Sequence, residues 1–161
     1  MNLLTRFGFL AEIRIDQSHC NYHLANSLRD QGFEILFVDA GRATRGGTGS
    51  QGASLRVFEG NGLPIPDIVA INPEMLLFVE IDLALSRAIS SFGRYRVAEK
   101  CVLQQFSCFA VGGRIPRLTL GFCQTGVVRC PERAAYTSLR ECELDLFVHF
   151  NTPRTPVMRW S

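Results

Sequence analysis

The sequence predicts an α/β fold in which a mixed central sheet is flanked by helices. Three observations predict it. Two short apolar segments within residues 66–82 are separated by Asn72-Pro73, a turn signal, and are expected to form a hairpin. Apolar residues then recur at spacings of three and four over residues 85–107, which is typical of a helix packed on a sheet. Further segments rich in β-branched and aromatic residues occur on both sides of this pair.

The residues before the hairpin contribute a helix and a first strand. Asp16 or Ser18 is placed to cap a helix that runs to about Gln31, and Gly32 is a typical stop signal after it. The next segment, residues 33–40 (FEILFVDA), has the composition of a strand.

A glycine-rich loop follows at residues 41–54 (GRATRGGTGSQGAS). It is not a P-loop, because no Gly-Lys-Ser/Thr follows its glycines. Arg42 and Arg45 are candidate nucleic-acid-binding residues, since a mobile loop with arginines is suited to close over a phosphate backbone. The alternative is a surface hairpin tip that binds nothing. Residues 55–59 are expected to return from the loop as a strand.

The rest of the chain supplies the second half of the sheet. After the long helix, we expect strands at residues 109–111, 117–123 and 144–150, with a second helix at residues 132–142. The tail, residues 151–161, contains two prolines and is expected to be extended.

Length and composition restrict the class of protein. A chain of 161 residues is the size of one domain, so residues 1–161 are predicted to form a single unit. No segment approaches the roughly 18 apolar residues of a membrane span, and the N-terminus has no clear signal-peptide cleavage site. The six cysteines include no C-x-x-C pair, which indicates buried reduced thiols in a cytoplasmic protein.

The cationic residues are almost all arginine. Of 17 Lys and Arg residues only Lys100 is a lysine, and the formal net charge is +2. Arginine suits phosphate binding, although a GC-rich coding sequence produces the same bias. This composition gives weak support to nucleic acid as a partner.

Three acids gather at one end of the predicted hairpin. Glu80 and Asp82 are two residues apart in a strand, so their side chains share a face, and the turn brings Asp67 beside them. Carboxylates at the rim of a buried sheet repel one another unless a cation or a proton offsets their charge. Their oxygens suit Mg²⁺ or Mn²⁺, so we predict a metal site made of these three residues. The alternative is a turn residue followed by two solvated strand-end acids.

These residues resemble the motif of the PD-(D/E)XK nuclease superfamily, in which Pro-Asp is followed by an apolar gap and then by Glu or Asp, any residue and Lys. Asp67 after Pro66, and Glu80, match this motif, whereas Asp82 stands where the lysine is expected. The resemblance covers about residues 18–124 and implies a restriction-endonuclease-like αβββαβ core. It also implies a Mg²⁺- or Mn²⁺-dependent endonuclease that hydrolyses phosphodiester bonds in double-stranded DNA. A domain this small covers little duplex, so we expect a homodimer or higher homo-oligomer.

The resemblance implies a catalytic lysine, for which three residues are candidates. Asp82 ranks first, as a further metal ligand or as the general base. Lys100 ranks second, as a lysine that has moved onto the helix of residues 85–107, although it lies on the far side of that helix from the buried stripe. Glu99, close to the stripe, ranks third as an acid supplied by the helix.

Two other functions remain open. A nuclease-fold module without catalysis would lack the lysine, as this chain does, and would bind nucleic acid or a protein partner. An RNA endonuclease is the other, because His19 and His23 share a face of the first helix. In the viral cap-snatching nucleases, which belong to the resemblance, a histidine from an early helix joins the acids. His23 is therefore a further metal-ligand candidate, with a packing or surface histidine as the alternative.

Overall fold

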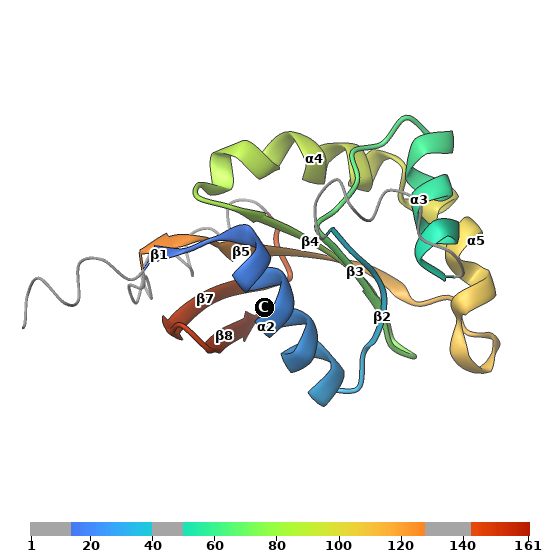
Figure 1. Ribbon diagram of the computed structural model, residues 1–161. Coiled ribbons are helices and arrows are strands. Elements are labelled where there is room, and N and C mark those ends of the chain that lie inside the picture. The colour runs from blue at the N-terminus through green and yellow to red at the C-terminus, as the bar shows by residue number, and fades with distance from the viewer. Residues whose placement is uncertain (1–13, 40–49, 128–142) are drawn as a thin grey trace, which may run out of the picture.

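The computed structural model describes residues 14–39, 50–127 and 143–161, and in these residues it shows a mixed α/β fold. Six strands form one sheet in the order β2-β3-β4-β5-β7-β8, and four helices flank it (Figure 1). The strands are β2 (Glu34–Val38), β3 (Ile68–Ile71), β4 (Met75–Asp82), β5 (Arg117–Gln124), β7 (Leu146–Thr152) and β8 (Thr155–Trp160). The helices are α2 (Gln17–Asp30), α3 (Ser50–Gly60), α4 (Leu85–Val97) and α5 (Glu99–Phe106). Two short strands, β1 (Arg14–Ile15) and β6 (Gly126–Val127), pair with each other outside this sheet.

The sheet combines both strand directions. β3 runs antiparallel to β2 and to β4, whereas β4, β5 and β7 are parallel to one another. A parallel neighbour requires a crossover connection, and α4 with α5 supplies it between β4 and β5. β8 closes the sheet as an antiparallel edge strand.

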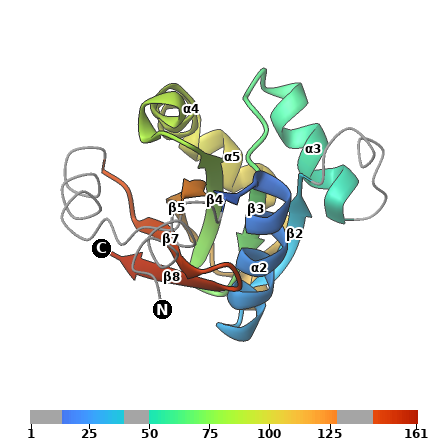
Figure 2. The same cartoon turned by 60° about the vertical axis from the view of Figure 1, so that its left-hand side comes forward.

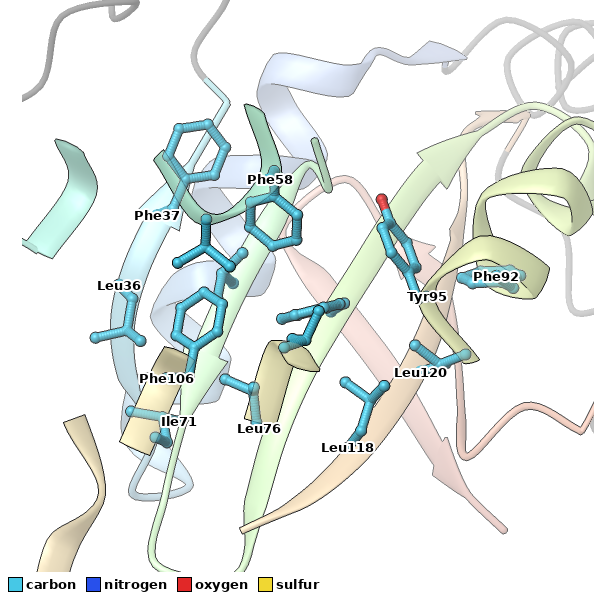
Figure 3. Close-up of a cluster of buried hydrophobic side chains, with 14 of the residues drawn as sticks. Leu36, Phe37, Phe58, Ile71, Leu76, Phe92, Tyr95, Phe106, Leu118 and Leu120 are labelled. Atoms are coloured by element: carbon cyan, nitrogen blue, oxygen red, sulfur yellow. The ribbon is translucent and has the colours of Figure 1, made fainter. Parts of the chain in front are cut away.

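Helices cover both faces of the sheet. α3, α4 and α5 lie over one face and α2 lies over the other (Figures 1 and 2). Side chains alternate along each strand, so Phe78 joins the buried cluster on the α4 side and Val79 joins the one on the α2 side. Figure 3 shows the first cluster, where the ring of Phe58 lies 6.2 Å from that of Tyr95 and 5.9 Å from that of Phe106. Its aromatic contacts join all three helices of this face to the sheet.

Two predicted elements are confirmed with their local causes. Asp16 caps α2, accepting a hydrogen bond of 2.8 Å from the His19 N–H, and Gly32 ends the helix region at φ +88°. In the β3–β4 hairpin, the Asn72 side chain accepts bonds of 2.9 and 2.7 Å from the N–H groups two and three residues later. These contacts are local in sequence, which is why the pattern predicted them.

The segment at residues 55–59 is helical, so the prediction of a strand there is wrong. It belongs to α3, which buries Val57 and Phe58 completely or nearly so. A five-residue apolar run fits either a strand or a helix. Contact with Phe106 of α5 decides between them, and that contact joins residues far apart in the sequence.

Two further predictions need correction. Residues 109–111 do not form a strand, because Ala110 lies between two 3₁₀ turns, Ser107–Phe109 and Val111–Gly113. The single helix predicted at residues 85–107 is divided at Ala98, where φ is −90° and ψ is 5°. The division allows α5 to turn from the axis of α4 toward α3 (Figure 1).

The tail is part of the sheet rather than a separate extended segment. Residues Thr155–Trp160 form β8, which pairs with β7, and the ring of Trp160 stacks on that of Phe33 at 6.1 Å. The sheet thus extends beyond residues 18–124, the range that the resemblance covers, because β7 and β8 belong to it. The helix predicted at residues 132–142 lies outside the described residues.

The cysteines only partly follow the prediction. Cys20 and Cys123 are buried, but Cys101 and Cys108 are exposed, and all four are free thiols. The remaining two lie outside the described residues. Among the residues that the structure describes, no helix combines the length and the apolar character that a membrane crossing requires.

Candidate active site

The predicted acids lie at the end of the hairpin opposite its turn. Ile68 pairs with Val79 across the two strands. Asp67 comes just before the first of these residues and Glu80 just after the second, so the two acids lie at the same level of the sheet. Asp82 is the last residue of β4, two positions beyond Glu80.

Asp67 is a buried carboxylate with hydrogen-bond donors at both oxygens. Oδ2 accepts the N–H of Ile81 at 2.6 Å, and Oδ1 accepts the side-chain amide of Gln17 from the first turn of α2. The regular pairing of β3 with β4 ends at Ile68 and Val79, and beyond it the carboxylate takes the place of a backbone carbonyl as the acceptor for the N–H of Ile81. The pKa of Asp67 is raised to about 6, chiefly because the carboxyl is buried. The charges of Asp39 and Asp82 contribute to this rise, and the hydrogen bonds from Ile81 and Gln17 oppose it.

Glu80 is held from the opposite face of the sheet. Its Oε1 accepts the hydroxyl of Tyr95 at 2.6 Å, and this hydroxyl also lies 3.1 Å from the carbonyl oxygen of Pro64. Burial raises the pKa of Glu80 to about 7, with smaller contributions from the charges of Asp67 and Asp82, while the tyrosine bond lowers it. A hydroxyl has one proton to donate but can also accept. A protonated Glu80 can therefore donate to Tyr95, which then donates to Pro64.

Asp82 directs the chain into α4. Its Oδ1 accepts the N–H of Leu83 at 2.6 Å and lies 3.5 Å from both the N–H of Ala84 and a guanidinium nitrogen of Arg87. The helix has no side-chain cap at Ala84, so these contacts help to order its entry. Asp82 thus has a clear local role that the resemblance to a nuclease did not imply.

The three acids are close enough to repel one another, and the fit of a divalent cation can be judged from their chemistry. The charge of Asp67 raises the pKa of Glu80, and the charge of Asp82 raises the pKa of both. Within the described ranges, no three His, Cys, Asp or Glu side chains converge in the way that a complete protein cage requires. Mg²⁺ does not need one, because it commonly binds one or two carboxylates together with water and substrate phosphates. The buried carboxylate of Asp67 and the half-buried one of Glu80 suit this cation as a donor set.

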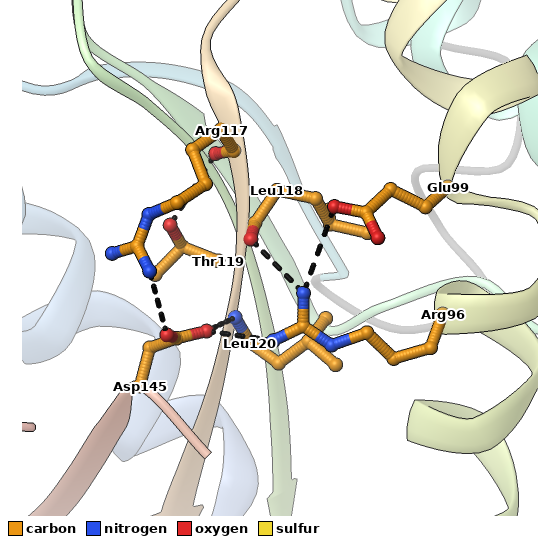
Figure 4. A network of polar contacts seen from close by, with 7 residues as sticks. All are labelled: Arg96, Glu99, Arg117, Leu118, Thr119, Leu120 and Asp145. Atoms are coloured by element: carbon orange, nitrogen blue, oxygen red, sulfur yellow. Dashed lines mark hydrogen bonds and ion pairs between the residues drawn. The ribbon is translucent and has the colours of Figure 1, made fainter. Parts of the chain in front are cut away.

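The other candidates for the lysine position are not brought to these acids. Lys100 is exposed on α5. Glu99 pairs with Arg96 at 3.7 Å, and Arg96 also pairs with Asp145 at 3.0 Å. Figure 4 shows this second network, in which Asp145 lies between Arg96 and Arg117. Its carboxylate also accepts a backbone N–H of β5 at 2.9 Å, so the network joins α4 to β5 and β7.

The predicted histidine faces another part of the molecule. The ring of His23 lies 4.4 Å from that of His19 and 6.5 Å from that of Phe150, and His19 bonds the carbonyl oxygen of Pro153. Burial lowers the pKa of His23, and so do the charges of His19 and Arg154. These contacts place both histidines beside the β7–β8 hairpin. Arg42 and Arg45 lie outside the described residues.

Two residues of the site were not predicted. Gln17 had no distinguishing signal, because a polar residue in the first turn of a helix is ordinary. Tyr95 did carry a signal, since it belongs to the buried stripe of α4 and a buried tyrosine hydroxyl requires a partner. No protein-family model, curated protein or solved structure matches this chain. A function must therefore be inferred from the residues themselves.

Proposed function

We propose that this protein is a divalent-metal-dependent endonuclease that hydrolyses phosphodiester bonds in DNA, with Asp67 and Glu80 as the ligands of Mg²⁺ or Mn²⁺. The observation that carries the proposal is this pair of acids at one end of β3 and β4, one buried and one half-buried, in which the charge of Asp67 opposes that of Glu80. A bound cation would offset both charges and supply an activated water and charge stabilisation at the phosphate.

The protein's own groups have separate tasks in this proposal. Gln17 and the backbone of Ile81 hold Asp67 in one orientation, and Tyr95 does the same for Glu80. Because both carboxyls are protonated more readily than usual, metal binding should strengthen as the pH rises through about 6 to 7. Asp82 remains the first candidate for a further ligand or general base.

The order of elements supports the same proposal. The chain passes through α2, β2, α3, β3, β4, α4–α5 and β5, so a helix, three antiparallel strands, a helical crossover and a parallel strand occur in this order, with α3 inserted between the first two strands. Apart from α3, this is the order expected of a restriction-endonuclease-like αβββαβ core, with Asp67 just before the second strand and Glu80 and Asp82 on the third. A nuclease of this kind would work inside the cell as a homodimer or higher homo-oligomer, which sedimentation analysis of the purified protein tests.

The test is cleavage of plasmid DNA with Mg²⁺ or Mn²⁺. Asp67→Asn and Glu80→Gln should each lower the cleavage rate at least about a hundredfold, because each removes a ligand charge. The control is Glu74→Gln, which removes an exposed acid at the other end of the same hairpin and should cut as the wild type does. Cleavage that survives both site substitutions together would show that the site lies elsewhere.

A second candidate function is a nuclease-fold module without catalysis, which binds nucleic acid or a protein partner. The observation that favours it is that the acids already accept protein hydrogen bonds, while Asp82, at the lysine position, contacts Arg87 and the backbone. Calorimetric titration with Mn²⁺ separates the two functions. Binding that is lost in Glu80→Gln supports the enzyme, and no binding at millimolar Mn²⁺ supports the module. An RNA endonuclease, the third possibility, would cut single-stranded RNA but not duplex DNA.

A further inference from the structure

The outer surface of α4 carries positive charge without a carboxylate of its own. Its sequence, LSRAISSFGRYRV, contains three arginines and three serines but no acid. Arg96 points inward to its ion pairs, whereas Arg87 and Arg94 are exposed. Arg94 donates to the carbonyl oxygen of Gly62 and makes no ion pair with a described residue. Its charge is therefore available to an anion from outside the chain.

A groove lies beside Arg94. It has a volume of about 440 Å³ and runs between α4 and residues 61–63. Two apolar side chains of α4 line it and remain exposed, Ile89 by 49% and Val97 by 92%. Gly93 lies between them and has no side chain, and the space in front of it is open, because a Cβ there would meet no atom within 4 Å. The surface thus combines a free cation, apolar contacts and room for close approach.

These groups belong to an exposed stripe of α4 whose first residue, Ser86, is four positions after Asp82. Ser86, Ser90, Gly93 and Val97 recur at helical spacing and are all exposed. The stripe extends about 16 Å along the helix axis. α4 begins directly after β4, which ends in Asp82, and lies as the outer layer over its face of the sheet (Figure 1). A linear ligand held at the acids would therefore continue naturally along the helix.

We propose that this stripe of α4 binds the sugar–phosphate backbone of the DNA strand held at the acids. The inference rests on the proposed function and names the surface that positions its substrate. Arginine and serine side chains are typical phosphate contacts, and Ile89 and Val97 suit the apolar edges of deoxyribose. A second copy of the chain fits less well, because a two-fold axis would set the arginines of α4 against each other with no acid on the helix to pair with them.

The test is the substitution Ser90→Glu, which adds a carboxylate one turn before Arg94 on an exposed surface. A glutamate at this spacing pairs with the arginine and favours the helix, so the protein should remain folded. Val97→Glu adds the same charge at the other end of the groove. The matched control is Gln104→Glu on an exposed position of α5. Binding of a short fluorescent DNA duplex is measured in EDTA, where no cleavage can interfere.

Each groove variant should weaken binding about fivefold at low salt, which is the effect of one like-charge contact about 4 Å from a phosphate in water. Ser90→Glu should also reduce the slope of log affinity against log salt by about one, since one phosphate contact is lost. The control should match the wild type. Equal DNA binding by the wild type, the two groove variants and the control overturns the inference. It is also overturned if the wild type is a dimer and only the groove variants are monomers, because the stripe would then contact a second copy. If the groove variants bind DNA more weakly but the wild type shows no metal-dependent cleavage, the inference about the stripe stands and the proposed nuclease activity is rejected.

Discussion

Replacing Glu80 by Gln should stabilise the metal-free protein above neutral pH and leave its stability nearly unchanged in acid. On folding, the pKa of this carboxyl rises from 4.5 to about 7, chiefly because it is buried. Between these pH values the folded protein retains a proton that the unfolded chain has released. The unfolded state binds fewer protons, so stability falls as the pH rises through this window, and the loss is complete above about pH 7.

The magnitude follows from the width of the window. At about 1.4 kcal/mol per pH unit, the ionised carboxylate costs the folded state about 3 kcal/mol. Gln has nearly the same shape, and its carbonyl oxygen can still accept the Tyr95 hydroxyl. The variant should therefore exceed the wild type by about 3 kcal/mol at about pH 8, and should match it at about pH 4.

Urea unfolding followed by far-ultraviolet circular dichroism at several pH values measures this difference. Glu74→Gln is the control, because its side chain is exposed and should follow the wild-type curve. Parallel curves for wild type and Glu80→Gln between pH 4.5 and 7 would refute the reasoning, since the carboxyl would then titrate equally in both states. Mn²⁺ at a thousandfold excess over Kd should reverse the order at high pH, because it stabilises only the wild type, by about 4.1 kcal/mol.

Three further substitutions test the contacts around the site and the fold. Tyr95→Phe removes the donor to Glu80 and should lower the free energy of unfolding by about 2 kcal/mol at about pH 8, but by less at about pH 5, where Glu80 is protonated. Urea titration at both pH values measures this loss. Asp145→Asn removes the charge between two guanidinium groups and should cost about 2 kcal/mol, a loss that added salt reduces only partly. Gly32→Ala should cost about 1 kcal/mol by thermal unfolding, because φ is +88° there while its surroundings are open.

The hairpin and its acids were predictable because their causes are local. Asn72 supplies both turn contacts within three residues, and the apolar runs on either side are long enough to be read as strands. Once the two strands and their turn were assigned, Asp67, Glu80 and Asp82 had to lie at the end of the hairpin opposite the turn, and no knowledge of tertiary contacts was needed. The same reasoning predicted α2 from its cap and its terminal glycine.

The hydrogen-bond partners of these acids were not predictable, because only the tertiary structure brings them close. Gln17 reaches Asp67 across 50 positions of the chain, and Tyr95 reaches Glu80 across 15. Helix α3 was missed for the same reason, since packing between helices outweighs the weak preference of a short apolar run. The last strand was missed for another reason: Pro156 indicates irregular chain, yet proline is tolerated in an edge strand such as β8.

The two acids at the centre of the proposal differ in what their loss would mean. Asp67 completes the ladder at Ile81, so removing its carboxylate leaves a buried N–H without an acceptor and costs about 1 to 3 kcal/mol before any effect on a metal. Among the residues that the structure describes, Glu80 accepts only from Tyr95, whose hydroxyl has Pro64 as a second acceptor, and the ionised form of Glu80 opposes folding. The charge of Glu80 therefore makes no favourable contribution to the fold above neutral pH. Activity lost with stability gained in Glu80→Gln would therefore be stronger evidence for a metal site than activity lost in any variant of Asp67.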